Sequence, residues 1–203
     1  MAVTGPLASG KSTFVEMLGR FGAETVSADK TVHHLLAEDE ETIDAVVRRF
    51  GEGVRGESGI DREALGGEVF GDAEALQDLE EILHPRVREE TDRRAAASDA
   101  DLFVAEIPLL FEGESGDQFD VTVAVTAPED RRREWTEERG MGEEQRRAIE
   151  DRQLSSKEMA RRADVVVQNY CDLDNMRKQA KDLVETVLGE DKGSEGEGGA
   201  EEA

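Results

Sequence analysis

The sequence lacks the features of a disulfide-bonded or membrane-spanning protein. Its single cysteine, Cys171, cannot form an internal disulfide and has no neighbours at metal-ligand spacing, so redox chemistry is not expected. No apolar run approaches the roughly 20 residues that span a bilayer, and the chain enters its first motif without a charged and apolar leader. We therefore expect a cytoplasmic protein without a membrane partner.

The sequence also has few positively charged residues relative to its acidic ones. The chain has 49 acidic and 25 basic residues, a net charge of −24, and arginine supplies most of the basic ones. Because phosphate backbones attract basic surfaces, this balance argues against a nucleic-acid partner. It fits either a cytoplasm rich in salt, where a Debye length of about 3 Å at 1 M screens the repulsion, or an acidic mesophilic enzyme.

The most informative segment that is present lies at residues 5–13, Gly-Pro-Leu-Ala-Ser-Gly-Lys-Ser-Thr. It matches G-x-x-x-x-G-K-[ST] between an apolar start and a helix-like run, which is the setting of a phosphate-binding loop. Lys11 is expected to reach the β- and γ-phosphates of a nucleoside triphosphate, and Ser12 the Mg²⁺ ion. The amides expected to hold phosphate oxygens are those of Ala8, Ser9, Gly10, Lys11, Ser12 and Thr13.

Hydrophobic spacing predicts an α/β protein of one domain with a small helical insertion. After the loop we expect a helix that ends at Gly22 and an extended segment around Val26. The runs 102–107 and 121–127 are typical of central parallel strands, and a last strand is expected at 165–168. The final helix should begin at about 172, end at Gly189, and carry an apolar face of Leu173, Met176, Ala180, Leu183 and Val187.

Charged segments fill the rest of the chain. Residues 41–50 and 72–97 are helix-periodic, with an interruption expected at His84-Pro85 because the residue before a proline avoids the helical region. Residues 129–163 are mostly helical and rich in arginine. Residues 190–203 are acidic and glycine-rich without an apolar face, so we expect a disordered tail.

Asp29 opens the segment that follows the strand around Val26. It therefore lies at the carboxyl end of a strand, where doubly wound sheets place their ligands. An aspartate here is equally suited to cap a helix N-terminus. Both roles are open on the residues alone.

The loop does not by itself separate kinases from GTPases. A GTPase needs a guanine-reading Asn/Thr-Lys-x-Asp stretch, and the nearest candidate, residues 169–172, lacks the lysine. The chain also has no Asp-x-x-Gly at a suitable place for a switch. A GTPase is therefore disfavoured.

From end to end, apart from the acidic tail, the chain resembles the dephospho-coenzyme A kinase family. The matching pieces, in order, are Ser-Gly-Lys-Ser-Thr of the loop, Ala28-Asp29 with His33, Phe50-Gly51, Gly59-Ile60-Asp61-Arg62 with Leu65, Val69-Phe70, Leu79-Glu80, Ile82-Leu83-His84-Pro85 with Val87-Arg88, Pro108-Leu109-Leu110-Phe111-Glu112, Phe119-Asp120, Gln153, and Ala163-Asp164 with Asn169. Each piece is short, but their number, order and spacing together are specific.

The resemblance implies a three-layer P-loop NTPase sandwich with a parallel central sheet over residues 1–189. It also implies a helical substrate insertion at about 35–98 and a lid at about 129–160. The implied activity is ATP- and Mg²⁺-dependent phosphorylation of the ribose 3′-hydroxyl of dephospho-coenzyme A by a monomer or small homo-oligomer. Asp29 matches the base or orienter of the acceptor hydroxyl, and Arg139 a lid arginine. The residues on the substrate side are His33, Arg62, His84 and Arg88.

For several of these residues, a purely structural role is an alternative to a role in substrate binding. Arg62 and Arg88 suit bidentate contacts with substrate phosphates, but they equally suit solvated helix positions beside the abundant acids. A lone histidine such as His84 is as often a structural hydrogen-bonding residue as a substrate ligand. Glu106 ends an apolar strand and matches the family loosely, as a Mg²⁺-side carboxylate. His34 is expected at the surface.

The sequence departs from the family pattern in the lid and in the loop. The family usually has arginine where this chain has Trp135 and Ile149, although Arg131 to Arg133, Arg146, Arg147 and Arg152 are close enough to substitute. In the loop, Pro6-Leu7-Ala8 replaces common glycines. Pro6 removes a backbone donor and Ala8 restricts φ, so fewer phosphate contacts are expected there.

Two other functions fit the same residues less well. A nucleoside or nucleotide monophosphate kinase would accept a substrate without the pantetheine arm. A non-catalytic ATP-binding regulator would keep Lys11 but tolerate change at Asp29, and the intact set of Asp29, Lys11, Ser12 and Arg139 argues against it.

Overall fold

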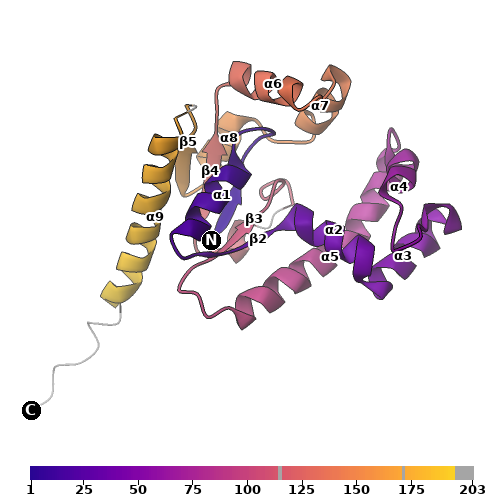
Figure 1. Cartoon of the computed structure of the whole chain (residues 1–203), viewed down its shortest axis with the longest axis horizontal. Coiled ribbons are helices and arrows are strands. Elements are labelled where there is room, and N and C mark those ends of the chain that lie inside the picture. The colour runs from indigo at the N-terminus through magenta and orange to yellow at the C-terminus, as the bar shows by residue number, and fades with distance from the viewer. Residues whose placement is uncertain (114–115, 171, 195–203) are drawn as a thin grey trace, which may run out of the picture. The chain divides into compact units, whose positions relative to one another are not determined.

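The computed structural model describes residues 1–113, 116–170 and 172–194 of the 203-residue chain. It divides into two compact units (Figure 1). The first unit comprises Met1–Thr25 and the chain from Asp99 onward, and the second comprises Val26–Ser98. Each unit has its own hydrophobic core, so each is described separately.

A five-stranded sheet organises the first unit, although the last two residues of its edge strand β2, Val26 and Ser27, are counted with the second unit. The strands are β1 (Ala2–Thr4), β2 (Glu24–Ser27), β3 (Phe103–Glu106), β4 (Thr122–Thr126) and β5 (Val165–Gln168), in the spatial order β2-β3-β1-β4-β5. β1 pairs in parallel with β3 and β4, and β4 with β5. The strands predicted at 102–107, 121–127 and 165–168 are confirmed, and the first two are interior strands of the sheet, as expected.

Helices cover both sides of this sheet (Figure 1). The helices of this unit are α1 (Lys11–Arg20), α6 (Glu129–Glu138), α7 (Glu143–Glu150), α8 (Ser156–Arg162) and α9 (Leu173–Ser194), with a short 3₁₀ turn at Gly116–Gln118. Of these, α1, α8 and α9 pack against the sheet, whereas α6 and α7 lie above it in the view of Figure 1. Phe14 and Leu18 of α1 pack with Met176 of α9 against Val3 and Val123 of the sheet, and all five are fully buried. This arrangement is the α/β phosphate-loop fold that the sequence predicts.

The end of α1 is specified by a glycine. Gly22 has φ 101°, its amide donates to Gly19 O at 3.2 Å, and the Ala23 amide donates to Leu18 O at 3.2 Å. This pair of bonds is a Schellman motif, which satisfies the last carbonyls of the helix and favours glycine in the left-handed conformation. The helix end predicted at Gly22 is confirmed.

The last helix begins at Leu173, as predicted, but its buried face and its end differ from the prediction. Leu173 is 62% exposed, and the buried face consists of Met176, Ala180, Leu183 and Val184. The end predicted at Gly189 is wrong, because α9 continues to Ser194. Gly189 does not adopt a positive φ, so it does not form a cap and only lowers helix propensity. Residues 195–203 of the predicted tail lie outside the described residues, as does Cys171.

The second unit is mainly helical. It contains α2 (Ala28–Glu38), α3 (Glu40–Phe50), a 3₁₀ turn at Glu52–Val54, α4 (Arg62–Val69) and α5 (Ala73–Ala97). Its core is a cluster of aliphatic side chains, Leu36, Ile43, Val46, Val47, Val54, Ile60, Leu65, Leu79 and Leu83. The helical insertion expected at about 35–98 falls within this unit.

Helix α5 runs through Pro85, so the interruption predicted at His84-Pro85 is wrong. A proline inside a helix removes one hydrogen bond and costs about 3 kcal/mol or more. The burial of Leu79 and Leu83 in the core of this unit offsets that cost. His84 consequently lies in the middle of a helix, with an exposed side chain.

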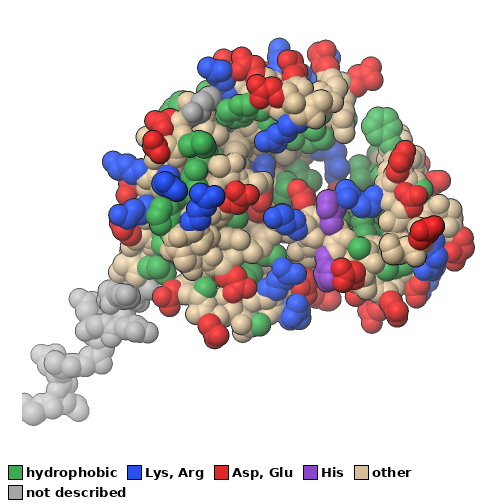
Figure 2. Space-filling model, viewed as in Figure 1, with side chains coloured by type: hydrophobic (Ala, Val, Ile, Leu, Met, Phe, Trp, Pro, Cys, Tyr) green, Lys and Arg blue, Asp and Glu red, His purple; other side chains and the backbone are tan. Residues whose placement is uncertain are grey.

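Acidic side chains are numerous on the face that Figure 2 shows. Figure 2 shows acidic side chains spread over the face in view, with arginine and lysine side chains between them. Among the described residues, none of the helices combines the length and the apolar character needed to cross a membrane.

Candidate active site

The loop between β1 and α1 has a backbone that only glycine permits at two positions. Gly5 has φ 152°, and a Cβ there would lie 2.2 Å from Val125 O of β4. Gly10 has φ 93° and immediately precedes α1, and a Cβ there would lie 2.5 Å from Nδ2 of Asn169. Both glycines of the motif are therefore required by close packing as well as by the backbone conformation.

Ala8 shows that the loop tolerates a strained residue. It has φ 57°, and it is the one non-glycine residue with a positive φ in the described chain. The left-handed conformation costs an L-amino acid about 1–2 kcal/mol. The loop therefore imposes the left-handed conformation on an alanine in spite of the cost, and the expectation of fewer phosphate contacts at this position stays a prediction.

Lys11 turns back over the start of the loop. Its Nζ donates hydrogen bonds to Gly5 O at 2.9 Å and to Pro6 O at 3.0 Å. The ammonium group is thus held beside the Gly5–Pro6 carbonyls at the mouth of the loop. In a phosphate loop this cation serves the β- and γ-phosphates.

Ser12 and Glu106 form a pair of oxygen donors beside the loop. Ser12 Oγ donates to Glu106 Oε1 at 2.7 Å, and Glu106, the last residue of β3, is only 8% exposed. Mg²⁺ in nucleotide sites is typically held by one or two such groups together with substrate phosphates. The described residues contain no cluster of three or more metal-ligating side chains, so the phosphates would have to complete the coordination shell.

Three further polar side chains hold the loop backbone. Gln153 Oε1 accepts from the Leu7 amide at 2.8 Å, and Arg132 Nη1 donates to the Leu7 carbonyl at 3.3 Å. Asn169 Nδ2 donates to Ser9 O at 3.0 Å. Contact with the loop backbone was not expected of any of the three, although Arg132 belongs to the group of arginines named as substitutes in the lid. Gln153 and Asn169 occur among the matched family positions, whereas nothing in the sequence distinguishes Arg132 from its neighbouring arginines.

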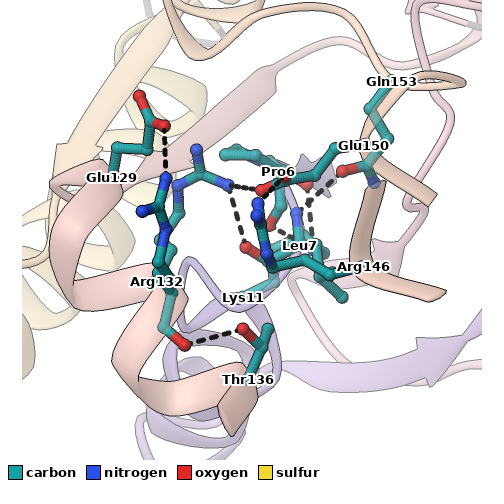
Figure 3. Close-up of polar contacts among 11 residues, drawn as sticks. Pro6, Leu7, Lys11, Glu129, Arg132, Thr136, Arg146, Glu150 and Gln153 are labelled. Atoms are coloured by element: carbon teal, nitrogen blue, oxygen red, sulfur yellow. Dashed lines mark hydrogen bonds and ion pairs between the residues drawn. The ribbon is translucent and has the colours of Figure 1, made fainter. Parts of the chain in front are cut away.

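The helices that follow β4 bring buried arginines to this part of the loop. Arg132 of α6 and Arg146 of α7 both form ion pairs with Glu150, the first at 3.1 Å. Figure 3 shows these side chains and Gln153 gathered around the Pro6–Leu7 segment. Arg139, the arginine that the sequence favoured, follows the last residue of α6 and is exposed.

Asp29 lies in the first turn of α2, directly after β2. The N-cap position belongs to Ser27, so the interpretation of Asp29 as the cap is wrong. His33 follows one turn later on the same helix, and both side chains are exposed. Residues four apart lie on the same side of a helix, so Asp29 and His33 share one exposed face.

The remaining predicted substrate residues are also exposed in the second unit. Arg62 is the first residue of α4, and His84 and Arg88 lie one turn apart on α5. Arg88 forms a loose ion pair with Asp92, at 3.9 Å. His34 forms a 3.4 Å contact with Glu38 at the surface, as predicted.

Asp164, another matched position, has a structural role. Its carboxylate accepts from the amide and the hydroxyl of Thr122, each at 2.7 Å. These hydrogen bonds, from the hydroxyl above all, lower the pKa of Asp164 below its ordinary value. The contact joins the starts of β4 and β5 and is remote from the loop in sequence and sheet position.

The first unit also contains an open cavity of about 460 Å³ that does not belong to this site. It is lined by Arg20, Phe21, Asp174, Arg177, Lys178 and Lys181. Arg20 and Phe21 lie at the C-terminal end of α1 and the other four residues belong to α9, whereas the phosphate loop leads into the N-terminal end of α1.

Comparison with known proteins agrees with this arrangement. The family model described as dephospho-CoA kinase matches residues 1–175. The dephospho-CoA kinase of Salinibacter ruber is 36% identical over 93% of this chain and 98% of its own length, and that of Frankia casuarinae is 35% identical over 93% and 83%. Among solved structures, TT1252 from Thermus thermophilus has a TM-score of 0.79 at 32% identity, covering 92% of this chain and 96% of that one.

More distant structures share the fold alone. Dephospho-CoA kinase from Campylobacter jejuni has a TM-score of 0.60 at 24% identity, and shikimate kinase from Acinetobacter baumannii has 0.53 at 14%. The match to the Campylobacter jejuni structure covers 92% of this chain and 96% of that one. The match to the shikimate kinase covers 93% of this chain and 92% of that one. The matches in sequence span the loop, the helical unit and the arginine-rich helices, and on these grounds the chain belongs to the dephospho-CoA kinase family.

Proposed function

We propose that this enzyme transfers the γ-phosphate of ATP to the ribose 3′-hydroxyl of dephospho-coenzyme A, giving coenzyme A and ADP. The observation that carries the proposal is the phosphate loop, with Lys11 at its mouth and the Ser12–Glu106 pair beside it, in a chain of this family. Phosphoryl transfer needs mainly positioning and charge stabilisation, and these residues supply both on the ATP side.

On the ATP side, the amides from Ala8 to Thr13 would hold the phosphates at the N-terminus of α1. Lys11 would place its charge at the β- and γ-phosphates. Ser12 and Glu106 are suitable ligands for Mg²⁺, which when bound neutralises phosphate charge. Arg139 remains the candidate from the family resemblance for a cation that approaches from the lid.

On the acceptor side, Asp29 would accept the proton of the 3′-hydroxyl as its oxygen attacks the γ-phosphorus. The bond from that phosphorus to the β–γ bridging oxygen breaks, and ADP leaves with the electron pair. His33, Arg62, His84 and Arg88 would bind the acceptor, the arginines through its phosphates. Their shared exposure on α2, α4 and α5 supports this role, since a substrate can reach them.

We also propose that the enzyme acts in the cytoplasm as a monomer or small homo-oligomer, without a nucleic-acid or membrane partner. The net charge of −24 supports the absence of a nucleic-acid partner. The single cysteine suits a reducing compartment.

An acceptor screen tests the activity. Purified protein with Mg²⁺-ATP is assayed for ADP release with dephospho-coenzyme A, AMP, adenosine and pantetheine, beside Lys11→Ala as a control. We expect turnover with dephospho-coenzyme A alone, and none in the variant, because the variant lacks the cation at the transferred phosphate. Turnover with AMP or adenosine would favour a nucleoside or nucleotide monophosphate kinase, and ATP binding without turnover a non-catalytic regulator.

A further inference from the structure

The arginine pair on α6 and α7 is the unusual buried feature of the first unit. Arg132 is 9% exposed and Arg146 is 7% exposed, and both ion pairs are made with the same carboxylate, that of Glu150. Two guanidinium groups and one carboxylate leave a net charge of +1. Arginine does not lose its proton in proteins, so this charge persists at every physiological pH.

A buried charge without a counter-ion is costly. Among the described residues, Nε of Arg132 is buried and has no hydrogen-bond partner. The chain has 49 acidic residues, and yet the ion pairs of both arginines are made with the same one, Glu150. A buried surplus of positive charge and an unused N–H donor, in a protein with so many acidic residues, are the features of an anion-binding site.

The position of the pair identifies which anion. Arg132 Nη1 donates to the carbonyl of Leu7 at 3.3 Å, and the carbonyl of the preceding residue, Pro6, accepts from Lys11 Nζ at 3.0 Å. Arg132 and Lys11 are therefore bound to adjacent carbonyls of one loop (Figure 3). Since the loop lysine serves the β- and γ-phosphates, Arg132 lies at the end of the loop where the γ-phosphate binds.

The sequence positions agree with this placement. Arg132 precedes Trp135 by three residues on α6, and Arg146 precedes Ile149 by three residues on α7. Residues three apart are neighbours on one side of a helix. Each of the two places where this chain lacks the usual arginine thus has an arginine one turn earlier on the same side of the same helix.

We propose that Arg132 and Arg146 bind the γ-phosphate of ATP in this enzyme, and that Glu150 is a positioning residue that holds the two guanidinium groups before ATP arrives. The inference rests on the proposed function, because it requires ATP in the phosphate loop. It assigns the binding of the transferred phosphate to two buried arginines, in addition to the exposed Arg139.

The first test is nucleotide affinity without acceptor, measured by calorimetry with Mg²⁺-ATP and Mg²⁺-ADP. Arg132→Gln and Arg146→Gln should each weaken ATP binding by on the order of 10- to 100-fold, the range of one lost charge-assisted contact, and should weaken ADP binding much less. Arg133→Gln is the matched control, since Arg133 is exposed on the same helix and contacts Glu129 at 3.6 Å. Unchanged ATP affinity, or equal losses for ATP and ADP, would overturn the proposal.

The second test uses Glu150→Gln and does not depend on the arginine variants folding. Removal of the carboxylate leaves two buried cations unpaired, so the Tm of the free protein should fall. The increase in Tm on adding ATP should then exceed that of the wild type, because the γ-phosphate replaces the missing negative charge. A purely structural cluster predicts an equal or smaller increase, and that result would overturn the proposal.

The two tests separate this inference from the proposed function. If the wild type and Arg133→Gln do not bind ATP, the proposed function fails. If they bind ATP and the Arg132, Arg146 and Glu150 variants respond as the wild type does, only the γ-phosphate assignment fails.

Discussion

Ala8 holds a left-handed backbone conformation that glycine would adopt without strain. Its φ of 57° costs an alanine about 1–2 kcal/mol. A strained residue of this kind persists only where the surrounding structure fixes the backbone. Here the fixed points are the contacts of Gly5 with β4 and of Gly10 with Asn169 on either side.

Ala8→Gly should therefore stabilise the protein. The relief of strain exceeds the cost of about 0.4–1 kcal/mol that glycine incurs through the unfolded chain, so the free energy of unfolding should rise by about 0.5–1 kcal/mol. Denaturant unfolding measures the change. Ala96→Gly, at an exposed position of α5, is the control and should lower the free energy by about 0.5–1 kcal/mol. A loss of stability in Ala8→Gly would contradict the strain argument.

Asp29→Asn separates a catalytic from a structural carboxylate. Because Ser27 is the N-cap of α2, the variant loses only the attraction of one first-turn charge to the helix dipole, about 0.3–1 kcal/mol. Turnover should fall by about 10²–10⁴-fold, as for a lost general base, while ATP affinity is unchanged. Single-turnover phosphate transfer from labelled ATP, with ATP and dephospho-coenzyme A both at saturating concentrations, measures the change in turnover. Asp72→Asn, at the N-cap of α5, should keep normal turnover, and near-normal turnover in Asp29→Asn would remove the base assignment.

At the scale of elements, the sequence predicts those whose signals are local. The loop motif, the glycine that ends α1 and the apolar runs of β3, β4 and β5 depend on neighbouring residues, and all are confirmed. The continuation of α5 through Pro85 is not predictable in this way, because it depends on burial of Leu79 and Leu83 against other helices. Propensity at one residue is overridden by the packing of a whole helix.

In the candidate site, too, the residues with local sequence signals were predicted and those that depend on tertiary packing were not. Lys11, Ser12 and Glu106 were expected from motif and strand position, and the structure brings Ser12 and Glu106 together. Arg132 and Arg146 were expected only as members of a larger group of lid arginines that could substitute for the missing ones. The choice among that group was not predictable, because burial and a shared carboxylate distinguish these two arginines, and neither feature is visible in a sequence rich in both charges.

The exposed arginines of α4 and α5 are predicted to serve the acceptor. Arg62→Ala and Arg88→Ala should each raise the KM for dephospho-coenzyme A more than the KM for ATP, at a cost of about 1.5–3 kcal/mol if a charge-assisted contact is lost. Arg48→Ala, exposed on α3, should change neither constant. Steady-state kinetics with each substrate varied in turn measures both KM values. Parallel changes in the two values would indicate that the arginines have a structural role and do not bind the acceptor.

Within α5, one carboxylate makes stability depend on pH. Glu90 accepts from Nε and Nη2 of Arg93, both at 2.8 Å, and from Nε of Arg94 at 2.7 Å. The hydrogen bonds from Arg93, followed by those from Arg94, lower the pKa of Glu90 from 4.5 to about 2. The folded state thus binds the proton more weakly than the unfolded state, so the ionised form stabilises folding.

Glu90→Gln should lower the Tm at neutral pH, and the difference from the wild type should shrink as the pH falls. The contribution of Glu90 is complete above the unfolded pKa of about 4.5 and is lost as the pH approaches 2, where the folded group is protonated. Melting curves between pH 7 and pH 2.5 measure the difference. Glu89→Gln, at an exposed position next in the chain, is the control, and a difference for Glu90→Gln that is constant with pH would exclude the linkage.

At the scale of the whole molecule, negative charge is shared by both units. Val26–Ser98 contains 19 acidic and 9 basic residues, and the rest of the chain carries the remaining excess of a net charge of −24. Many of the basic groups are already in ion pairs within a helix, such as Arg162 with Glu158 at 2.9 Å and Arg147 with Glu143 at 2.5 Å. The uncompensated carboxylates therefore repel one another over the surface of each unit.

Screening of this repulsion should raise stability in salt. The Debye length falls from about 30 Å at 0.01 M to about 3 Å at 1 M, and self-repulsion of a highly charged protein destabilises its compact state. The Tm should therefore rise with KCl from 10 mM to 1 M. Sucrose at matched osmolality is the control for solute exclusion, because it does not screen charge. Exposed ion pairs weaken over the same range, but each contributes at most about 1 kcal/mol, so repulsion among 49 carboxylates should dominate. A Tm that does not change with KCl would mean that the acidic surface reflects composition alone and not adaptation to a salt-rich cytoplasm, and it would leave the kinase assignment intact.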